Sequence, residues 1–510
     1  MNQPLICLTL TGETLQENVA LVKKYLPYID IVELRVDHLK EDEQLHARKF
    51  PSMINIPCIL TIRRVIDGGK YKGSESARTV LFARALAFAD QNPYKNFAYV
   101  DFEDDFHVPS LQDAAQAFGT KVIRSFHDFE NPVKNLRQRF EQMRKTEYEI
   151  PKIAFMPKTL SDVTDLFKEA SEITDIDHIV CAMGNMGVPS RILANKLNSY
   201  LTYVSPVETV SKVNGIGHID PITLNELYNF RNLNDETDIF AVTGFPLKVT
   251  SSPLIHNEGY KKHNLNSVFI PLASTSIKES LEFANCIGIK GMAVTVPYKE
   301  DLISQIEEID ADVGEIGASN TVCFKDDHWI GHNTDAYGIT RALQEFLGVK
   351  KIRRRKVAII GAGGAAKAVA YAVKQLGGRA CIFNRTVENA RKLAERFGFE
   401  YASLTPDTVD ILDRYSDIII QTTKVGMNST GPSCEENNPI YYYTFRGTEN
   451  LIDIVYDPEI TPVMTVAQQA GCKVLNGFSM LKYQGYKQFK YFTGVDYESN
   501  KSEWTKSSCC

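Results

Sequence analysis

The sequence lacks a long uninterrupted apolar run. Nowhere do its 510 residues approach the roughly 18 consecutive apolar residues of a membrane-spanning helix, so we expect no membrane partner. The opening stretch, MNQPLICLTLTG, has no charged segment followed by a cleavage site and so does not resemble a secretory signal. The formal net charge of -6 at pH 7 is the wrong sign for a nucleic-acid-binding protein, and we expect no nucleic acid partner.

Paired cysteines are also missing. The ten cysteines include no CxxC pair, and Cys7, Cys58, Cys181 and Cys381 each stand alone in an apolar stretch. Such residues are typical of small buried side chains in a reducing compartment. No His/Cys cluster has the spacing of metal ligands, so we expect no metal. We expect a cytoplasmic protein, and the mature form of a plastid protein would look the same. The sequence says nothing about oligomeric state.

The length of the chain predicts several domains, because 510 residues exceed what one hydrophobic core usually supports. Short apolar runs recur through residues 1–210, most of them separated by polar, helix-like stretches. The runs are LICLTL, DIVELRVD, PCILTIRR, FAYVDFE, KVIRSFHD, PKIAFMP, HIVCAMG and YLTYVSP. Eight buried strands alternating with helices favour an α/β fold of the (β/α)8 TIM-type barrel class. An open doubly wound sheet is the alternative.

Polar and charged side chains gather where these predicted strands end, which is where barrels of this class form their active sites. They are Glu33, Arg35, Arg63, Glu103, His127, Lys158 and Arg191. A lone lysine after a strand is most often a surface residue. Beside other cations and partly desolvated, however, Lys158 would have a lowered pKa and could form a Schiff base. Several arginines facing one mouth would repel each other, which suggests a substrate that carries a carboxylate.

The segments ELRVD, R…DGG, VDFE, SFHDF, KIAFMP and MGNMGVPSR resemble the type I 3-dehydroquinate dehydratases over roughly residues 4–230. The resemblance implies that Lys158 forms an imine with the substrate ketone. It implies that His127 removes the C2 proton and protonates the departing hydroxyl, and that Glu103 orients His127. The residues that would hold the carboxylate and hydroxyls of the substrate are Glu33, Arg35, Arg63 and Arg191.

One loop departs from that family. After the eighth strand the family usually carries Ala-Pro-Gly-Gln, whose glutamine closes over the substrate. Here the stretch reads SKVNGIGHIDP, with His218 where the glutamine is expected. The departure concerns closure of this loop and leaves the Schiff-base chemistry in place.

The polar stretch YNFRNLNDETD, residues 228–238, ends the barrel pattern, and we place a boundary near Asn234. Beyond it stand GFPLKVTSSPLIHN, GMAVTVPYKE, GASNTV and GHNTDAYG, each of which could singly be a turn or a cap. Together they resemble the shikimate dehydrogenases over roughly residues 238–493. The resemblance implies Lys299 and Asp335 as a catalytic pair. The implied substrate-binding residues are Thr250, Ser252, Thr295, Asn320, Asn333, Tyr456 and Gln484.

Mild departures from the dehydrogenase family occur near these positions. Thr250 stands where serine is common, Val249 replaces a histidine, Ala293 replaces an asparagine, and Gln421 stands where asparagine is frequent. The first three could loosen the choice of substrate.

A glycine-rich turn in KVAIIGAGGAAKA lies between a predicted strand and a helix, so its backbone amides can approach a pyrophosphate at the helix N-terminus. At the end of the next predicted strand, ACIFNRT, a nicotinamide enzyme that uses NAD usually has an acid. Arg385 stands there instead and would accommodate a 2'-phosphate, which favours NADP. The expected cofactor-binding residues are Gly361, Ala362, Gly363, Gly364, Ala365, Asn384, Arg385, Thr386 and Thr423.

We therefore expect four segments: a barrel at 1–234, a substrate lobe at 235–338 completed by a helix at 478–495, a Rossmann NADP-binding lobe at 339–477, and a polar tail at 496–510. The resemblances imply a bifunctional enzyme that converts 3-dehydroquinate to 3-dehydroshikimate and then to shikimate. Quinate is an alternative substrate for the second half. A regulatory binding protein built from such domains is the alternative from a different class.

Overall fold

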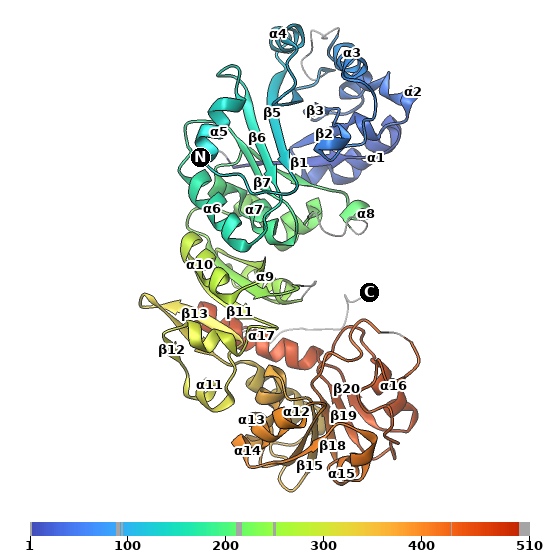
Figure 1. Ribbon diagram of the computed structural model, residues 1–510, viewed down its shortest axis with the longest axis vertical. Helices are drawn as coiled ribbons and strands as arrows, with labels where there is room; N and C mark the ends of the chain where they lie inside the picture. Colours follow the sequence, from blue (N-terminus) through green and yellow to red (C-terminus); the bar gives the residue numbers. More distant parts are fainter. Residues whose placement is uncertain are drawn as a thin grey trace. The chain divides into compact units, whose positions relative to one another are not determined.

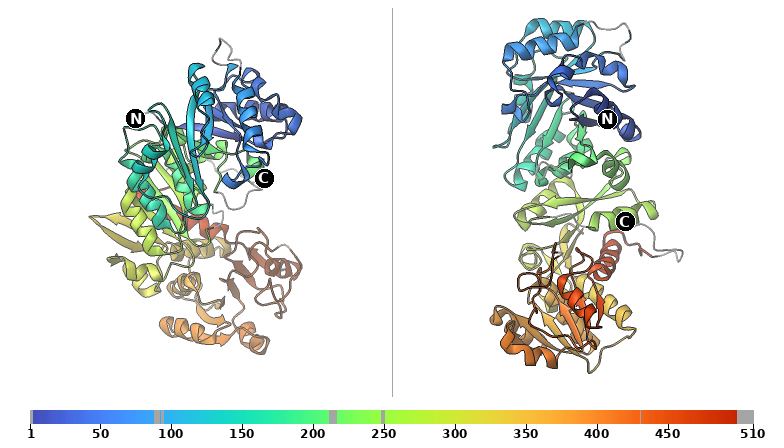
Figure 2. Two further views of the ribbon diagram at one scale, coloured as in Figure 1. Left: turned by 45° about the horizontal axis from the view of Figure 1, so that its top comes forward. Right: turned by 90° about the vertical axis from the view of Figure 1, so that its right-hand side faces the viewer.

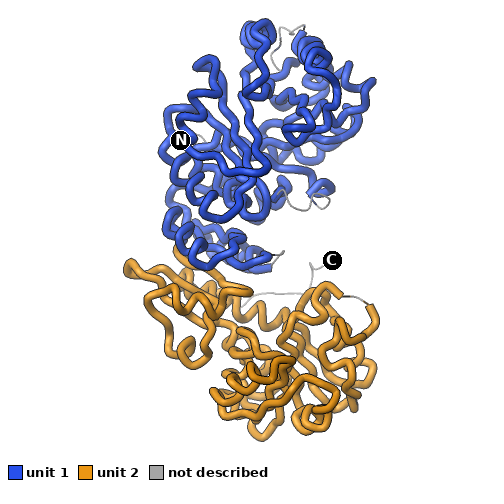
Figure 3. The backbone as a smooth tube through the Cα atoms, in the orientation of Figure 1, with its two compact units in different colours: residues 1–289 blue, residues 290–510 orange. Residues whose placement is uncertain are grey.

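The computed structural model describes residues 3–87, 92, 95–210, 217–247, 251–429 and 431–498. The chain divides into two compact units, residues 1–289 and 290–510 (Figure 3). Thr250 and Val249 lie outside the described residues. Within the described residues, no helix is long and apolar enough to cross a membrane.

Eight parallel strands form the core of the first unit (Figure 1). They are β1 (Leu5–Leu10), β2 (Ile31–Arg35), β3 (Cys58–Thr61), β4 (Tyr99–Glu103), β5 (Lys121–Asp128), β6 (Ile150–Phe155), β7 (Ile179–Ala182) and β8 (Leu201–Val204). Their order is β7-β6-β5-β4-β3-β2-β1-β8. An isolated parallel bridge between His178 and Ser199 joins β7 to β8, the two ends of that order. The eight predicted strands and the barrel class are therefore confirmed, and the open sheet is excluded.

Helices alternate with these strands and flank them in two further views (Figure 2). They are α1 (Leu15–Tyr25), α2 (Glu41–Gln44), α3 (Glu75–Leu86), α4 (Pro109–Ala117), α5 (Leu136–Met143), α6 (Leu160–Ser171), α7 (Val188–Ile192) and α8 (Val207–Val210). Local sequence sets several helix starts. Thr14 and Glu17 form a capping box at α1, as Thr159 and Asp162 do at α6.

The interior of the barrel is layered, because successive side chains of a strand point to opposite faces. An apolar floor takes one residue from each strand: Cys7, Ile31, Ile59, Tyr99, Ile123, Ile150, Ile179 and Leu201. Two residues further along, the same faces carry Thr9, Glu33, Thr61, Asp101, Ser125, Lys152, Cys181 and Tyr203. We call this second set the polar layer. Three of the predicted single cysteines, Cys7, Cys58 and Cys381, are buried and free, and Cys181 is partly buried.

The first unit continues past the barrel with β9 (Asp238–Gly244), α9 (Ser252–Lys262), β10 (Ser267–Ala273) and α10 (Ile277–Ile287), in which β9 and β10 are parallel. Helix α10 packs against α6 of the barrel. Phe167 and Phe283 meet edge to face with ring centroids 5.3 Å apart, and Glu279 accepts a hydrogen bond of 3.2 Å from the backbone of Leu160. This aromatic pair and the capped N-terminus of α6 tie the two parts together.

The second unit begins within β11 (Ile289–Val294), which pairs with β13 (Thr321–Lys325); β13 pairs with β14 (His328–His332), and β14 with β12 (Glu308–Ile309). Helices α11 (Ala311–Ile316) and α12 (Asp335–Leu347) belong to this part. A separate six-stranded parallel sheet follows, ordered β17-β16-β15-β18-β19-β20. Its strands are β15 (Lys356–Ile360), β16 (Arg379–Asn384), β17 (Glu400–Ser403), β18 (Ile418–Gln421), β19 (Asn450–Asp453) and β20 (Lys473–Leu475).

This parallel sheet is buried on both faces, as a doubly wound sheet must be. Alternate residues of β15 enter different apolar clusters, Val357 and Ile359 in one and Ala358 and Ile360 in the other. The helices of this region are α13 (Gly364–Leu376), α14 (Val387–Phe397), α15 (Val409–Arg414), α16 (Pro462–Gln469) and α17 (Phe478–Thr493). The predicted Rossmann architecture is confirmed.

Helix α17 lies so close to α12 that a glycine is needed between them. A Cβ atom on Gly338 would stand 2.6 Å from the carbonyl oxygen of Met480 and 2.9 Å from the Cβ of Gln484. Since Gln484 reaches a polar cluster from α17, this close approach positions a site residue.

We predict that Gly338→Ala lowers the free energy of unfolding of the second unit by about 1–3 kcal/mol, the usual cost of overpacking. Gly314→Ala in α11 is the matched control, because its new Cβ would meet its nearest neighbour, Ile309, only at 4.0 Å. That control should be neutral or slightly stabilising, since alanine favours a helix over glycine. Urea unfolding of both variants checks the prediction, and equal stability of the two would contradict it.

Candidate active sites

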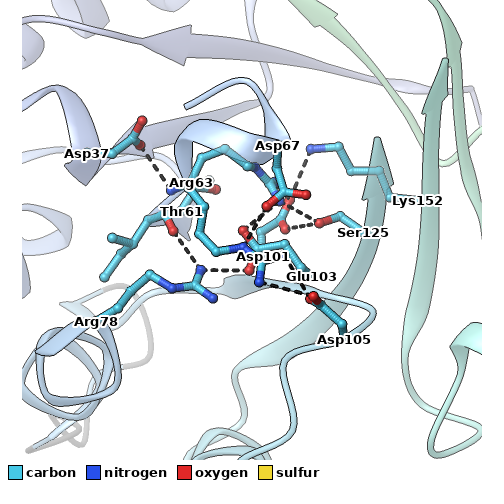
Figure 4. Close-up of polar contacts among 12 residues, drawn as sticks. Asp37, Thr61, Arg63, Asp67, Arg78, Asp101, Glu103, Asp105, Ser125 and Lys152 are labelled. Atoms are coloured by element: carbon cyan, nitrogen blue, oxygen red, sulfur yellow. Dashed lines mark hydrogen bonds and ion pairs between the residues drawn. The ribbon is translucent and has the colours of Figure 1, made fainter. Parts of the chain in front are cut away.

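The barrel site is organised around one buried arginine (Figure 4). Arg63 follows β3 and is only 3% exposed. Its guanidinium lies 2.8 Å from a carboxylate oxygen of Asp101 and 3.1 Å from one of Glu103. It also donates a 2.8 Å hydrogen bond to the hydroxyl of Ser125. The carboxylates more than offset the cost of burial, so the pKa of Arg63 is raised and it stays a cation.

Lys152 shares one of these carboxylates. Its Nζ atom donates to Asp101 at 3.0 Å and lies 3.7 Å from Glu33. Burial would raise the pKa of Asp101, but the charges of Arg63 and Lys152 outweigh it and lower that pKa far below its usual range. The next inward-facing residue of β6 is Ala154, so no large side chain of that strand covers Lys152 from the mouth. The barrel therefore holds a buried amine between two carboxylates.

The structure does not bring Lys158 to this site. Lys158 lies three residues beyond the end of β6, is exposed, and donates a 3.0 Å hydrogen bond to the side chain of Asn131. The expectation that Lys158 stands beside His127 and Glu103 is therefore corrected. The physical reason is that Lys158 lies in the loop between β6 and α6, whereas the polar layer is lined by residues within the strands.

Glu103 and His127 also differ from expectation. Both oxygens of Glu103 are taken by arginines, one by Arg63 and the other by Arg78 of α3 at 2.6 Å. The Nδ1 atom of His127 is buried without a hydrogen-bond partner. Burial, together with the charges of Arg63 and Lys152, lowers the pKa of His127 well below its usual value, so its ring is neutral near pH 7.

The arginines of the mouth are in unlike environments. Arg35 forms a two-point ion pair with Asp37, at 2.9 and 2.8 Å. With Arg63 paired as well, repulsion among arginines no longer argues for a bound anion. Arg191 is different: it is 4% exposed, it donates to the backbone carbonyl of Ala182, and its Nε atom is buried without a partner.

His218 stands at the same mouth. Its Nδ1 atom lies 2.6 Å from the hydroxyl of Ser205, just past the end of β8. Burial and the neighbouring charge of Arg191 lower the pKa of His218 to about 4. Residues 211–216 of this loop lie outside the described residues, so its closure stays a prediction.

A second polar cluster lies in the second unit. Lys299 follows β11, Asp335 begins α12, and their side chains meet at 2.5 Å. Asn320 donates to the other oxygen of Asp335 at 2.9 Å and to Gln484 of α17 at 3.2 Å. Asn333 caps α12 by accepting a hydrogen bond from the backbone of Ala336. Four of the predicted residues, Lys299, Asp335, Asn320 and Gln484, thus form one hydrogen-bonded group.

Other predicted substrate residues lie outside this hydrogen-bonded group. Thr295 is half-buried after β11, Tyr456 is half-buried after β19, and Ser252 opens α9 in the first unit. Gln421 of β18 donates to Asp453, a buried carboxyl whose pKa rises to about 6 because of burial.

The glycine-rich turn joins β15 to α13. Gly361 has a φ of +114°, which L side chains rarely adopt, and a Cβ on Gly363 would meet nothing within 4 Å. Beside the turn is a cavity of about 350 Å³ whose lining includes Ala362, Gly363 and Asn384. Arg385 and Thr386 are exposed after β16, and Thr423 follows β18 close to Gly361. The turn therefore has room for a phosphate-bearing group against backbone amides.

Known proteins match both halves of the chain. Residues 6–235 match the type I 3-dehydroquinase model, residues 242–322 the shikimate dehydrogenase substrate binding domain, and residues 342–436 the shikimate / quinate 5-dehydrogenase model. The bifunctional 3-dehydroquinate dehydratase/shikimate dehydrogenase of Arabidopsis thaliana is 30% identical over 97% of this chain and 83% of that protein. The chain belongs to this bifunctional family.

Relatives of the second half alone are also similar. The NADP(+) shikimate dehydrogenase of Pyrococcus furiosus is 35% identical over 52% of this chain and 93% of that enzyme. Among solved structures, the shikimate dehydrogenase of Aquifex aeolicus is 31% identical over 52% of this chain and 95% of its own, with a TM-score of 0.47. The structure of dehydroquinate dehydratase and shikimate dehydrogenase from S. pombe is 23% identical. It covers 98% of this chain and 97% of its own, with a TM-score of 0.42.

Three charged residues of the barrel site were not among the predicted site residues. Asp101 and Lys152 lie inside β4 and β6, and Arg78 reaches in from α3. The sequence does indicate two of them. Side chains alternate between the two faces of a strand, so Asp101 lies on the same face as Glu103. Lys152 is a charged residue within an otherwise apolar run. Nothing in the sequence marks Arg78, whose side chain is fully buried by tertiary packing.

We predict that acid destabilises the barrel between pH 6.5 and 4. Burial lowers the pKa of both His38 and His218 to about 4, the charge of Arg35 adding to the effect at His38. The unfolded chain takes up these protons near pH 6.5, so folding stability falls as the pH drops towards 4. Hydrogen exchange of barrel amides at several pH values measures this slope.

His218→Gln should reduce that slope, because its proton uptake is removed from the unfolded state. His328→Gln on β14 is the control: His328 is only partly buried and its pKa is raised by the carbonyl of Asp326 and the side chain of Glu308. An unchanged slope in His218→Gln would show that this histidine is not desolvated by the fold.

Proposed function

We propose that this chain catalyses two consecutive reactions: dehydration of 3-dehydroquinate to 3-dehydroshikimate in the barrel, and reduction of that ketone to shikimate by the second half with NADPH. The observation that carries the proposal is that each half holds a buried or half-buried lysine in a carboxylate-lined polar cluster, Lys152 in one and Lys299 in the other. Family membership supports both activities.

Lys152 is the lysine we assign to imine formation, in place of Lys158. Its amine adds to the substrate ketone, water leaves, and a protonated imine remains. Asp101 and Glu33, at 3.0 and 3.7 Å from Nζ, stabilise the positive charge that persists on this nitrogen. An imine cation withdraws electrons from the neighbouring carbon and so acidifies its hydrogen.

His127 then acts as the base. Because its pKa is lowered, the ring is neutral and can accept the C2 proton. The electron pair left behind expels the hydroxyl, which takes the proton back from His127 and departs as water. Hydrolysis of the imine releases 3-dehydroshikimate and restores Lys152. Arg191, with a buried Nε lacking a partner, is the arginine we assign to the substrate carboxylate.

We predict that substitutions of the three lysines affect the two activities differently. Lys152→Ala should abolish dehydration and leave shikimate oxidation intact, because the second polar cluster is built from other residues. Lys158→Ala should leave dehydration unchanged, since its side chain is exposed and bonded to Asn131. Lys299→Ala should lower the reduction rate by ~10²–10⁴-fold, the range for general acid–base catalysis.

Borohydride trapping with 3-dehydroshikimate, followed by peptide mapping, provides the direct readout. The adduct should map to Lys152 in the wild-type protein. An adduct on Lys158, or full dehydration by Lys152→Ala, would return the imine role to Lys158.

In the second half, NADPH supplies the hydride that reduces the ketone carbon. Lys299 donates a hydrogen bond to Asp335 at 2.5 Å, and its ammonium can deliver a proton to the resulting alkoxide oxygen. Asn320 donates a hydrogen bond to the second oxygen of Asp335, and this bond fixes the orientation of the carboxylate towards Lys299. The open space at Gly363 and the φ of Gly361 fit a pyrophosphate at the start of α13.

The preference for NADP over NAD is assigned to cations at the adjoining cavity. Its lining includes the cations Lys367, Lys392 and Arg396, together with Asn384, which directly precedes the exposed Arg385 in the chain. The NADP(+) specificity in the names of the curated relatives supports this assignment. No carboxylate follows β16 to bind ribose hydroxyls, where Asn384, Arg385 and Thr386 stand.

We predict that Arg385→Ala raises the KM for NADPH by about tenfold or more, the usual cost of a lost hydrogen bond to a charged group, and barely changes the KM for NADH. Arg391→Ala in α14, the helix that follows Arg385, is the control, because Arg391 is already paired with Glu388 and Glu395. Steady-state kinetics with both nucleotides test the assignment. Equal losses for NADPH and NADH would remove Arg385 from 2'-phosphate recognition.

Quinate is the alternative substrate of the second half, and the size of the pocket near Ser252 and Thr250 would decide between it and shikimate. The binding-protein alternative is opposed by the two lysine clusters. The plant relative carries the word chloroplastic in its name, whereas we infer a cytoplasmic location for this chain from composition alone.

A further inference from the structure

Tyr203 brings an unusual group into the polar layer of the barrel. It lies in β8, and the face of its ring stands over Lys152, with Nζ 4.4 Å from the ring centroid. Such a contact between an ammonium and an aromatic face is attractive and holds the lysine in place. The ring therefore helps to position the amine that is proposed to form the imine.

The hydroxyl of Tyr203, unlike its ring, makes no contact that holds another residue of the protein in place. It is buried and has no hydrogen-bond partner. Elsewhere in the same barrel a buried phenol is satisfied: the hydroxyls of Tyr99 and Tyr200 meet at 2.6 Å. A buried hydroxyl without a partner is costly, because its hydrogen bonds to water have been given up and not replaced. Phenylalanine would fill the same space without that cost.

The charges around Tyr203 fix its protonation state. Burial and the carboxylate of Glu33 raise the pKa of the phenol well above its usual value of 10, and Arg63 opposes this only in part. The hydroxyl is therefore a neutral donor throughout the physiological range. A neutral donor on a ring that stands over the amine is suited to an oxygen of the molecule that reacts with that amine.

We propose that Tyr203 is a substrate-contacting residue of the dehydratase site, whose hydroxyl donates a hydrogen bond to the oxygen of the ketone whose carbon Lys152 attacks. The same bond would hold that oxygen as it becomes the hydroxyl of the carbinolamine, before it leaves as water. This inference rests on the proposed role of Lys152. It assigns a specific partner to a hydroxyl that the protein leaves unsatisfied.

The test is Tyr203→Phe, which keeps the ring over Lys152 and removes only the hydroxyl. We expect the rate of borohydride trapping and the kcat for dehydration to fall about tenfold or more, as when one donor to a reacting oxygen is removed. The KM should change less than kcat. The ratio of wild-type to variant rates should stay constant from about pH 6 to about pH 9, because the phenol does not ionise there.

Stability provides the second readout. The Tm of Tyr203→Phe should equal or exceed that of the wild-type protein, because a buried unsatisfied hydroxyl is lost. Tyr99→Phe is the matched control: it breaks the Tyr99–Tyr200 hydrogen bond in the floor of the barrel, and should lower the Tm while leaving dehydration unchanged. A structural role for Tyr203 would instead lower its Tm along with its activity.

The outcomes separate this inference from the proposed function. If no adduct forms on Lys152 in the wild-type protein, the imine assignment itself is wrong. If the adduct forms on Lys152 equally fast in Tyr203→Phe and in the wild type, the assignment of Lys152 stands and the role of Tyr203 is overturned. A ratio of rates that rises with pH would also overturn it, since it would indicate an ionised phenolate acting as a base.

Discussion

A balance of buried charge governs the first half of this protein. Arg63 and Lys152 are held inside a barrel, where an isolated cation would be strongly disfavoured, and Asp101 compensates both at once. The carboxylate stays ionised because the two cations surround it, and His127 stays neutral because they repel a third charge. The lysine, the base and the arginine thus depend on the same pair of oxygens. Loss of either cation would remove part of the charge that keeps Asp101 ionised and His127 neutral.

The fold could be predicted from the sequence in more detail than the site. Eight apolar runs of strand length, with helix-like stretches between, contain enough periodicity to define the barrel, and the glycine turn before α13 marks the nucleotide sheet. The imine-forming lysine was predicted at Lys158 because charged residues at strand ends are easy to recognise, whereas we propose Lys152. Lys152 sits inside an apolar run, where its burial depends on carboxylates from β2 and β4 that no local pattern reveals. The ion pairs of Arg63 and the inward reach of Arg78 are likewise products of tertiary packing.

In the part of the chain that the structure describes, the polar cluster of the second half has a single ion pair, between Lys299 and Asp335. Lys299 and Asp335 face each other directly, and the amide of Asn320 holds the carboxylate of Asp335 while also donating to Gln484. These residues come from a loop, a strand end and two helices, so their alignment relies on helix packing rather than on a rigid barrel wall. The absence of a side chain at Gly338 lets α17 come close enough to α12 to contribute Gln484. This dependence explains why residues far apart in the sequence form one polar group.

The bridge between His178 and Ser199 makes the stability of the barrel depend on whether a substrate is bound. Among the described residues the strand pairing between β7 and β8 is limited to that bridge, with a hydrogen bond from the backbone of Val180 to the side chain of Ser199 beside it, so the wall has a seam with little backbone pairing. Arg191 follows β7 on one side of the seam, while Tyr203 lies in β8 on the other. A substrate held by both would act as a tie across it, closing the wall by side-chain contacts where backbone hydrogen bonds are few. Catalytic occupancy and mechanical integrity would then be coupled, and the barrel would be most resistant to opening while it is at work.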